Sequence, residues 1–167
     1  PQSLLSPTDE VLTELPILTT QMFPSPTPTT ACREGELIEV TIPSGAMKKS
    51  LAFLVYLPPC LEEDGEYPLL ILLHGQQYDE HAWMNFGIVD LANAWIAGGR
   101  AGPFIMVFPF EENDLMEPYE EHYGDAIVKD LIPFLEENYP VCTQARCRAI
   151  GGFSRGAAWA VWTGLNY

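Results

Sequence analysis

The sequence predicts an α/β fold, with a mostly parallel sheet covered by helices on both faces. From about residue 34 onward, strand-like apolar runs alternate with segments of helical spacing, which is typical of this class. The run Leu69–Leu73 is apolar throughout and so suits a strand buried on both faces. A length of 167 residues fits one domain.

The strands are expected to begin with an antiparallel pair, Glu36–Ile42 and Ser50–Leu57. Both runs are rich in β-branched or apolar residues, and a Pro-Ser-Gly turn joins them. Further strands are expected at Leu69–Leu73, Phe104–Phe108 and Arg148–Ile150.

Three segments have helical spacing: Asp90–Ala97, Asp125–Asn138 and Ala157–Leu165. One side of the first carries Leu91, Ala94 and Trp95. The inner stripe of the second consists of Ile127, Val128, Leu131 and Leu135. Pro133 lies inside this second helix, where it should cause a kink.

The chain is strongly acidic, with 23 Asp and Glu against 8 Lys and Arg and a net charge of −15. Nucleic acids and anionic membranes are therefore not expected as partners, because both need clustered Lys and Arg. No apolar run approaches the length of about 18 residues that an integral membrane helix needs. The 47% hydrophobic content excludes a wholly disordered chain.

Residues 1–31 are expected to be an exported linker or stalk, because Pro alternates with Ser and Thr near their end. Residues 32–167 would form the folded domain. The four cysteines form no CxxC pair, so a zinc site is not expected. Two disulfides are expected, most simply Cys32–Cys60 and Cys142–Cys147, although three connectivities are open. The alternative is four unpaired buried thiols, as in a cytosolic protein. The linker directly before Cys32 favours disulfides instead, and with them a secreted or cell-surface location.

The strongest chemical motif is Gly152-Phe153-Ser154-Arg155-Gly156, which lies between an expected strand and an expected helix. In this G-x-S-x-G setting the serine occupies a sharp strand-to-helix turn, where larger side chains at Gly152 and Gly156 would collide. Ser154 is therefore the candidate catalytic nucleophile. A glycine-rich turn with an incidental serine is the alternative interpretation.

The second motif is His74-Gly75-Gln76-Gln77, directly after the buried strand. Acyl transfer needs preorganised donors for the oxyanion of its tetrahedral intermediate. The backbone N–H of Arg155 is one candidate donor, and that of Gln76, or secondly Gln77, is the other. Gly75 would let the backbone approach. His74 is expected to support the loop by binding neighbouring backbone groups rather than to act in catalysis.

The chain resembles the esterase D, feruloyl esterase and mycolyltransferase group of the α/β-hydrolase superfamily, from about Leu51 to its last residue. The resemblance rests on Tyr56–Pro59, Tyr67–Gly75, Trp83, Asp130–Leu135, Tyr139 and Ile150–Gly156. It implies the α/β-hydrolase fold and hydrolysis of a small-molecule or carbohydrate-linked ester through a Ser-Asp/Glu-His triad. No cofactor is implied.

In this fold the acid and the histidine of the triad follow the serine in the chain. The 13 residues after Ser154 contain no Asp, Glu or His. We therefore expect a C-terminally truncated domain that lacks the last strands and has little activity alone. His122 could substitute as a base, but an exposed loop histidine is the preferred interpretation.

Other functions stay open at this stage. An acyltransferase would use the same residues, and a non-catalytic surface or assembly module would keep only the scaffold. The acidic stretch Glu111–Glu121 could bind Ca²⁺, although a solvated loop is preferred. Asp79-Glu80-His81 could bind a metal, but neighbouring loop residues rarely share one ion, so no metal site is expected. The oligomeric state is not determined by the sequence.

Overall fold

The computed structural model describes residues 34–112 and 122–167. In these residues, one five-stranded sheet has the order β1-β2-β4-β3-β5. The strands are β1 (Glu36–Ser44), β2 (Lys49–Leu57), β3 (Leu69–Leu73), β4 (Ile105–Pro109) and β5 (Arg148–Gly152). Every strand expected from the sequence is confirmed, with shifts of a few residues at the ends.

The sheet is mixed in direction. β1 pairs with β2, and β2 with β4, in antiparallel fashion, whereas β3 pairs in parallel with both β4 and β5. Parallel neighbours need a crossover connection, which here is helical. The three parallel strands therefore end at the same edge of the sheet, and the loops that follow them meet there.

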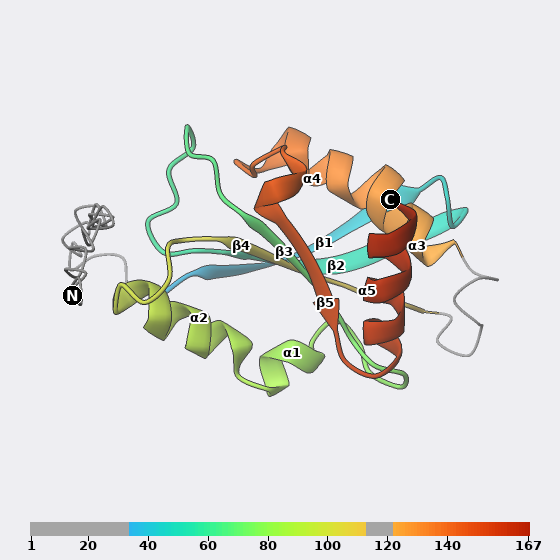
Figure 1. Ribbon diagram of the computed structural model, residues 1–167, viewed down its shortest axis with the longest axis horizontal. Helices are drawn as coiled ribbons and strands as arrows, with labels where there is room; N and C mark the ends of the chain where they lie inside the picture. Colours follow the sequence, from blue (N-terminus) through green and yellow to red (C-terminus); the bar gives the residue numbers. More distant parts are fainter. Residues whose placement is uncertain (1–33, 113–121) are drawn as a thin grey trace, which may run out of the picture.

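The helices cover both faces of the sheet, as expected (Figure 1). One face carries α1 (Ala82–Asn85) and α2 (Ile88–Ala97). The opposite face carries α3 (Tyr123–Ala126), the π-helical turn η1 (Ile127–Leu131), α4 (Ile132–Asn138) and α5 (Arg155–Asn166). A 3₁₀ turn, η2 (Ala145–Cys147), leads into β5.

Two apolar cores lie on the two faces of the sheet. Alternation along β2 places Phe53 and Val55 in one core and Leu54 and Tyr56 in the other. In the same way β3 contributes to both cores, with Ile71 on one side and Leu72 on the other. The wholly apolar sequence of β3 follows from this burial on both faces.

The face of α2 that packs on the sheet differs from the side singled out in the sequence. Leu91 and Trp95 are each 44% exposed, whereas Ala92 is buried, and Ile88 and Val89 pack against the core. Both sides of this helix are apolar, so its periodicity could not choose between them. Its start after Gly87, two residues earlier than expected, adds Ile88 and Val89 to the inner side.

The long segment from Tyr123 to Asn138 is helical, and its predicted inner residues Ile127, Leu131 and Leu135 are fully buried. The segment is not one regular helix, because the π turn Ile127–Leu131 separates α3 from α4, and Pro133 lies in the first turn of α4. Proline has no N–H to donate within a helix, and the first turn is the position where this loss is best tolerated.

The predicted disulfide Cys142–Cys147 is present, with the two Cα atoms 5.9 Å apart. Cys60 is also disulfide-bonded. Its expected partner Cys32, like the proposed stalk of residues 1–31, lies outside the described residues.

Candidate active site

Ser154 lies at the junction of β5 and α5, on the turn that the G-x-S-x-G motif predicts. Its backbone has φ 52° and ψ −121°, a conformation that non-glycine residues rarely adopt. Such a conformation costs about 1–3 kcal/mol and persists only where the surrounding structure enforces it. The side chain is exposed and is placed at the N-cap of a twelve-residue helix.

The two flanking glycines are required by close backbone packing. A Cβ atom on Gly156 would lie 2.4 Å from the carbonyl oxygens of both Leu73 and His74. A Cβ atom on Gly152 would lie 2.5 Å from the carbonyl carbon of Gly156. The end of β3 thus lies directly against the first turn of α5. Only glycine at these two positions lets the serine turn pack this closely on the neighbouring strand.

The loop after β3 reaches Ser154. A Cβ atom on Gly75 would lie 2.6 Å from Phe153 Cε2 and 3.3 Å from the Cβ of Ser154. The loop turns at once, with the Tyr78 N–H donating to the Gly75 carbonyl at 3.2 Å and Gln77 at φ 64°. Gly75 is buried and Gln76 is exposed. The two motifs, about 80 residues apart in the sequence, therefore lie side by side.

His74 is 2% exposed and binds backbone groups on both of its nitrogens. Nε2 accepts the N–H of Glu111 at 2.9 Å, so the proton lies on Nδ1, which donates to the Gly75 carbonyl at 2.8 Å. The ring stacks on Phe110 at 5.7 Å. His74 thus joins the loop after β3 to the loop after β4.

Glu111 differs from the solvated loop residue that the acidic sequence around it predicts. It is only 2% exposed. Its Oε1 accepts Arg155 Nε at 2.8 Å, Arg155 Nη2 at 2.6 Å and Trp159 Nε1 at 2.6 Å. A buried carboxylate is costly unless it is paired in this way. Its position after β4, at the edge where parallel strands end, was the signal that could have identified it.

Four aromatic rings gather next to the serine turn. Phe153 lies at the centre, with Tyr78, Trp83 and Phe86 at centroid distances of 5.3–5.4 Å. Tyr78 is 50% exposed and Phe86 is 57% exposed. We call these four residues the aromatic cluster. It offers apolar ring surface to solvent beside Ser154.

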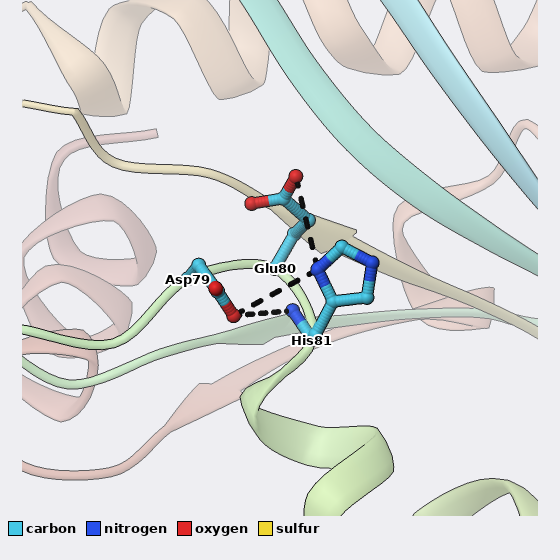
Figure 2. Close-up of side chains that lie close together, drawn as sticks. All are labelled: Asp79, Glu80 and His81. Atoms are coloured by element: carbon cyan, nitrogen blue, oxygen red, sulfur yellow. Dashed lines mark hydrogen bonds and ion pairs between the residues drawn. The ribbon is translucent and has the colours of Figure 1, made fainter.

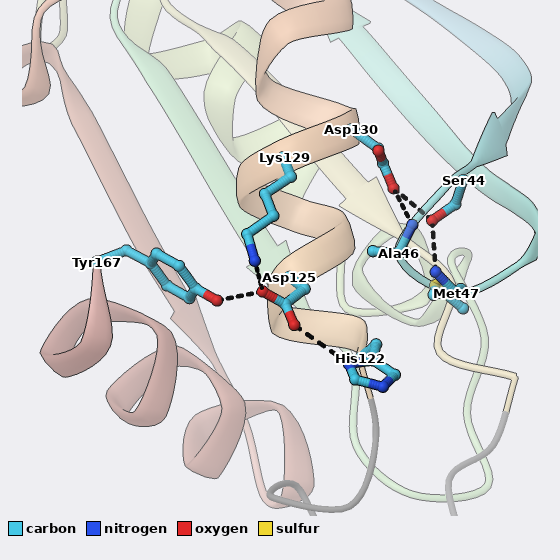
Figure 3. Close-up of polar contacts among 8 residues, drawn as sticks. All are labelled: Ser44, Ala46, Met47, His122, Asp125, Lys129, Asp130 and Tyr167. Atoms are coloured by element: carbon cyan, nitrogen blue, oxygen red, sulfur yellow. Dashed lines mark hydrogen bonds and ion pairs between the residues drawn. The ribbon is translucent and has the colours of Figure 1, made fainter.

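His122, considered as a substitute base, binds Asp125 instead. Its Nδ1 lies 3.2 Å from Asp125 Oδ2, and Lys129 and Tyr167 bind the other oxygen of that carboxylate (Figure 3). Hydrogen bonds from Lys129 first, then from Tyr167 and His122, hold the pKa of Asp125 well below its ordinary value. This exposed network fastens the end of α5 to α3.

The second group of polar contacts in Figure 3 is structural and joins the π turn to the turn between β1 and β2. Asp130 Oδ2 accepts the Ser44 hydroxyl at 2.6 Å and the Ala46 N–H at 3.1 Å. Ser44 Oγ in turn accepts the Met47 N–H. The π turn thereby fixes the turn between β1 and β2.

His81 lies among carboxylates on the surface (Figure 2). Its Nδ1 is 3.8 Å from Asp79 Oδ1 and 3.9 Å from Glu80 Oε1. Its Nε2 is 3.7 Å from Glu39 Oε1. One oxygen of Asp79 already accepts the N–H of His81. The ligand atoms of Asp79, Glu80 and His81 lie within 4.8 Å of one another, but the three residues are neighbours on one surface loop, and Glu80 is half-buried. Most of the acidic stretch considered for Ca²⁺, residues 113–121, lies outside the described residues.

Within the two described ranges, no helix combines the length and apolar character needed to cross a membrane.

Comparison with known proteins points to an esterase family. Residues 44–167 match a family model described as "Putative esterase". The chain is 28% identical over 134 residues to an endo-1,4-beta-xylanase/feruloyl esterase of Xylanibacter ruminicola, covering 73% of this chain and 18% of that protein.

The solved structures that resemble the chain include two ferulic acid esterases. The first superposes with a TM-score of 0.72 at 26% identity, covering 80% of this chain and 55% of the other. The second, from Anaeromyces mucronatus, has a TM-score of 0.67 at 21% identity and coverages of 84% and 56%. The chain thus spans little more than half of these structures. Its fold is that of the α/β-hydrolases, and because the family match covers most of its length, the protein belongs to this esterase family.

Proposed function

We propose that the protein is a serine esterase that works through an acyl-enzyme, with Ser154 as the nucleophile. The observation that carries the proposal is the exposed Ser154 held at φ 52° at the start of α5, with Gly75 packed against it. Strained backbone at an exposed serine is typical of nucleophile turns in hydrolases.

In the proposed reaction, the Ser154 hydroxyl attacks the ester carbonyl, and its proton passes to a histidine. The negative oxygen of the tetrahedral intermediate is bound by the backbone N–H groups of Arg155 and Gln76. The helix dipole of α5 adds favourable potential at the same point. Collapse of the intermediate expels the alcohol, and water then releases the acid from Ser154.

The histidine and its acidic partner are proposed to come from a part of the fold that this sequence does not include. The three histidines of the chain all engage other partners: His74 binds the backbone, His81 faces carboxylates, and His122 binds Asp125. The 167 residues alone would then hydrolyse esters slowly, since a serine without its base is a weak nucleophile.

For the substrate, we propose esters of aromatic acids of the feruloyl type. The names of two relatives point to such esters. The aromatic cluster supports this choice, because exposed rings beside the nucleophile can stack on an aromatic acyl group. Two disulfide-bonded segments support an extracytoplasmic location, where such bonds persist.

The test uses a fluorophosphonate probe and methyl ferulate. Each is offered to the 167-residue chain and to the same chain joined to whatever coding sequence follows it in the gene. We expect labelling of Ser154 in the longer protein, mapped by mass spectrometry, together with ester hydrolysis. Both should disappear in Ser154→Ala.

Ser50→Ala is the matched control, because Ser50 is an exposed serine on β2 and does not belong to the turn that carries Ser154. It should keep full labelling and hydrolysis. Labelling at another residue, or hydrolysis that survives Ser154→Ala, would refute Ser154 as the nucleophile.

A further inference from the structure

Glu111 has contacts that lead to both proposed oxyanion donors. Its carboxylate binds the Arg155 side chain, while its own backbone N–H binds His74. The first contact fixes the residue whose N–H is one donor. The second leads, through His74, to the peptide that carries the other.

The His74 side of this connection works through one peptide plane. The Nδ1–H of His74 donates to the Gly75 carbonyl. That carbonyl and the N–H of Gln76 belong to the same planar peptide unit and point in opposite directions. Fixing the carbonyl therefore fixes the direction of the Gln76 N–H, and the donated hydrogen bond polarises it further.

The Arg155 side holds the strained turn. Arg155 and Trp159 are one helical turn apart at the start of α5, and both donate to Glu111 Oε1. The Arg155 and Glu111 side chains are 13% and 2% exposed. A buried ion pair contributes little net stability compared with apolar packing. Its value here is geometric, because it anchors the helix turn directly after Ser154.

We infer that Glu111 is a positioning residue that holds both halves of the oxyanion hole, one through its side chain and one through its main chain. This inference rests on the proposed function. Glu111 does not touch the substrate; it acts through Arg155 and His74.

The test is Glu111→Gln, which keeps the shape of the side chain and removes its charge. In ¹⁵N-labelled chain, we expect the NMR order parameters of the Gln76 and Arg155 amides to fall from about 0.85 to below about 0.6. The amides of β1 and β2 should not change. The indole N–H of Trp159 should exchange with solvent at least about tenfold faster. If the folded variant keeps the wild-type order parameters at either Gln76 or Arg155, the inference is wrong.

Asp130→Asn is the matched control, because it also removes a carboxylate that accepts two hydrogen bonds, but in the turn between β1 and β2. It should leave the Gln76 and Arg155 amides ordered. If Glu111→Gln fails to fold, Trp159→Phe removes a single donor to Oε1 and should loosen the Arg155 amide alone.

These readouts do not depend on turnover. Ser154→Ala should leave the order parameters unchanged, so the proposed function can fail while the inference holds. In the hydrolysing protein, Glu111→Gln should lower kcat about tenfold or more with KM within about twofold, since misplaced donors affect the transition state.

Discussion

The two glycines of α5 differ in their surroundings. Gly156 has no room for a side chain, whereas Gly164 has. A Cβ atom on Gly156 would lie 2.4 Å from the carbonyl oxygens of Leu73 and His74. These oxygens belong to the backbone, so they could move away only by distorting the end of β3. A Cβ atom on Gly164 would meet nothing within 4 Å in the described residues, apart from its chain neighbours and the backbone of its own helix.

We predict that Gly156→Ala lowers the free energy of unfolding by about 1–3 kcal/mol, the usual cost of overpacking. Gly164→Ala should raise it by up to about 1 kcal/mol, because alanine favours the helix. Urea unfolding of the two variants checks this. Equal effects at the two positions would contradict the packing of α5 on β3.

Tyr56 connects β2 to α2 through a hydrogen bond from its hydroxyl to Asn93 Oδ1 at 2.8 Å. Burial raises the pKa of Tyr56 to about 12. Because the folded pKa lies above the unfolded value of about 10, the neutral hydroxyl contributes stability below pH 10. That stability is lost as the pH rises from about 10 to about 12.

We therefore predict that Tyr56→Phe flattens the alkaline fall in stability over this range. The measurement is the free energy of unfolding as a function of pH in both proteins. Parallel curves from pH 9 to 12 would show that this hydroxyl does not titrate with folding.

Among the elements, the aromatic cluster joins the loop after β3, α1 and the serine turn. Phe86 is its most exposed ring and stacks edge-on against Phe153 at 5.3 Å. If Phe86 were replaced by alanine, methyl ferulate bound at Ser154 would lose a contact between rings, which contributes about 1 kcal/mol. It would also bury less apolar area.

We predict that Phe86→Ala raises the dissociation constant of methyl ferulate about tenfold. It is measured by NMR titration in a Ser154→Ala background, which prevents turnover. Trp95→Ala removes an aromatic ring of 44% exposure from the outer side of α2 and serves as the control. A similar loss in both variants would place the ester elsewhere.

The segment before β5 depends on the Cys142–Cys147 bond. Cys142 is buried, and its N–H donates to the Tyr67 carbonyl, which ties this segment to the residues before β3. Removing the bond in Cys142→Ala/Cys147→Ala frees a short loop in the unfolded chain. We predict a loss of about 2 kcal/mol in the free energy of unfolding. A reducing agent should destabilise the parent more than the double variant, in which only the disulfide of Cys60 remains to be reduced.

On the scale of the whole molecule, the net charge of −15 is the dominant electrostatic feature. Like charges repel one another in the compact state, and salt screens this repulsion over about 10 Å at 0.1 M. We predict that the thermal midpoint rises between 0.01 and 0.2 M NaCl. A midpoint that falls over this range would mean that the ion pairs outweigh the repulsion. Differential scanning calorimetry decides between them.

The sequence by itself predicted the five strands, the helices other than α1, and the glycines of the serine turn, and it favoured the short disulfide among three connectivities. Each prediction depends on neighbouring residues: the β-branched and apolar run of β2, the five apolar residues of β3, and a spacing of five residues between Cys142 and Cys147. Local patterns of this kind are visible without knowledge of distant contacts.

Only the tertiary structure decided which side of α2 is buried and which side chains the Glu111 carboxylate binds. The α2 helix is apolar on two sides, so its position on the sheet, and not its periodicity, selects the inner one. In the sequence, Glu111 is indistinguishable from the other acids of its loop. The structure shows that it pairs with Arg155, which is 44 residues away in the chain. Pairings across such distances are created by the sheet order, which brings the ends of β3, β4 and β5 together.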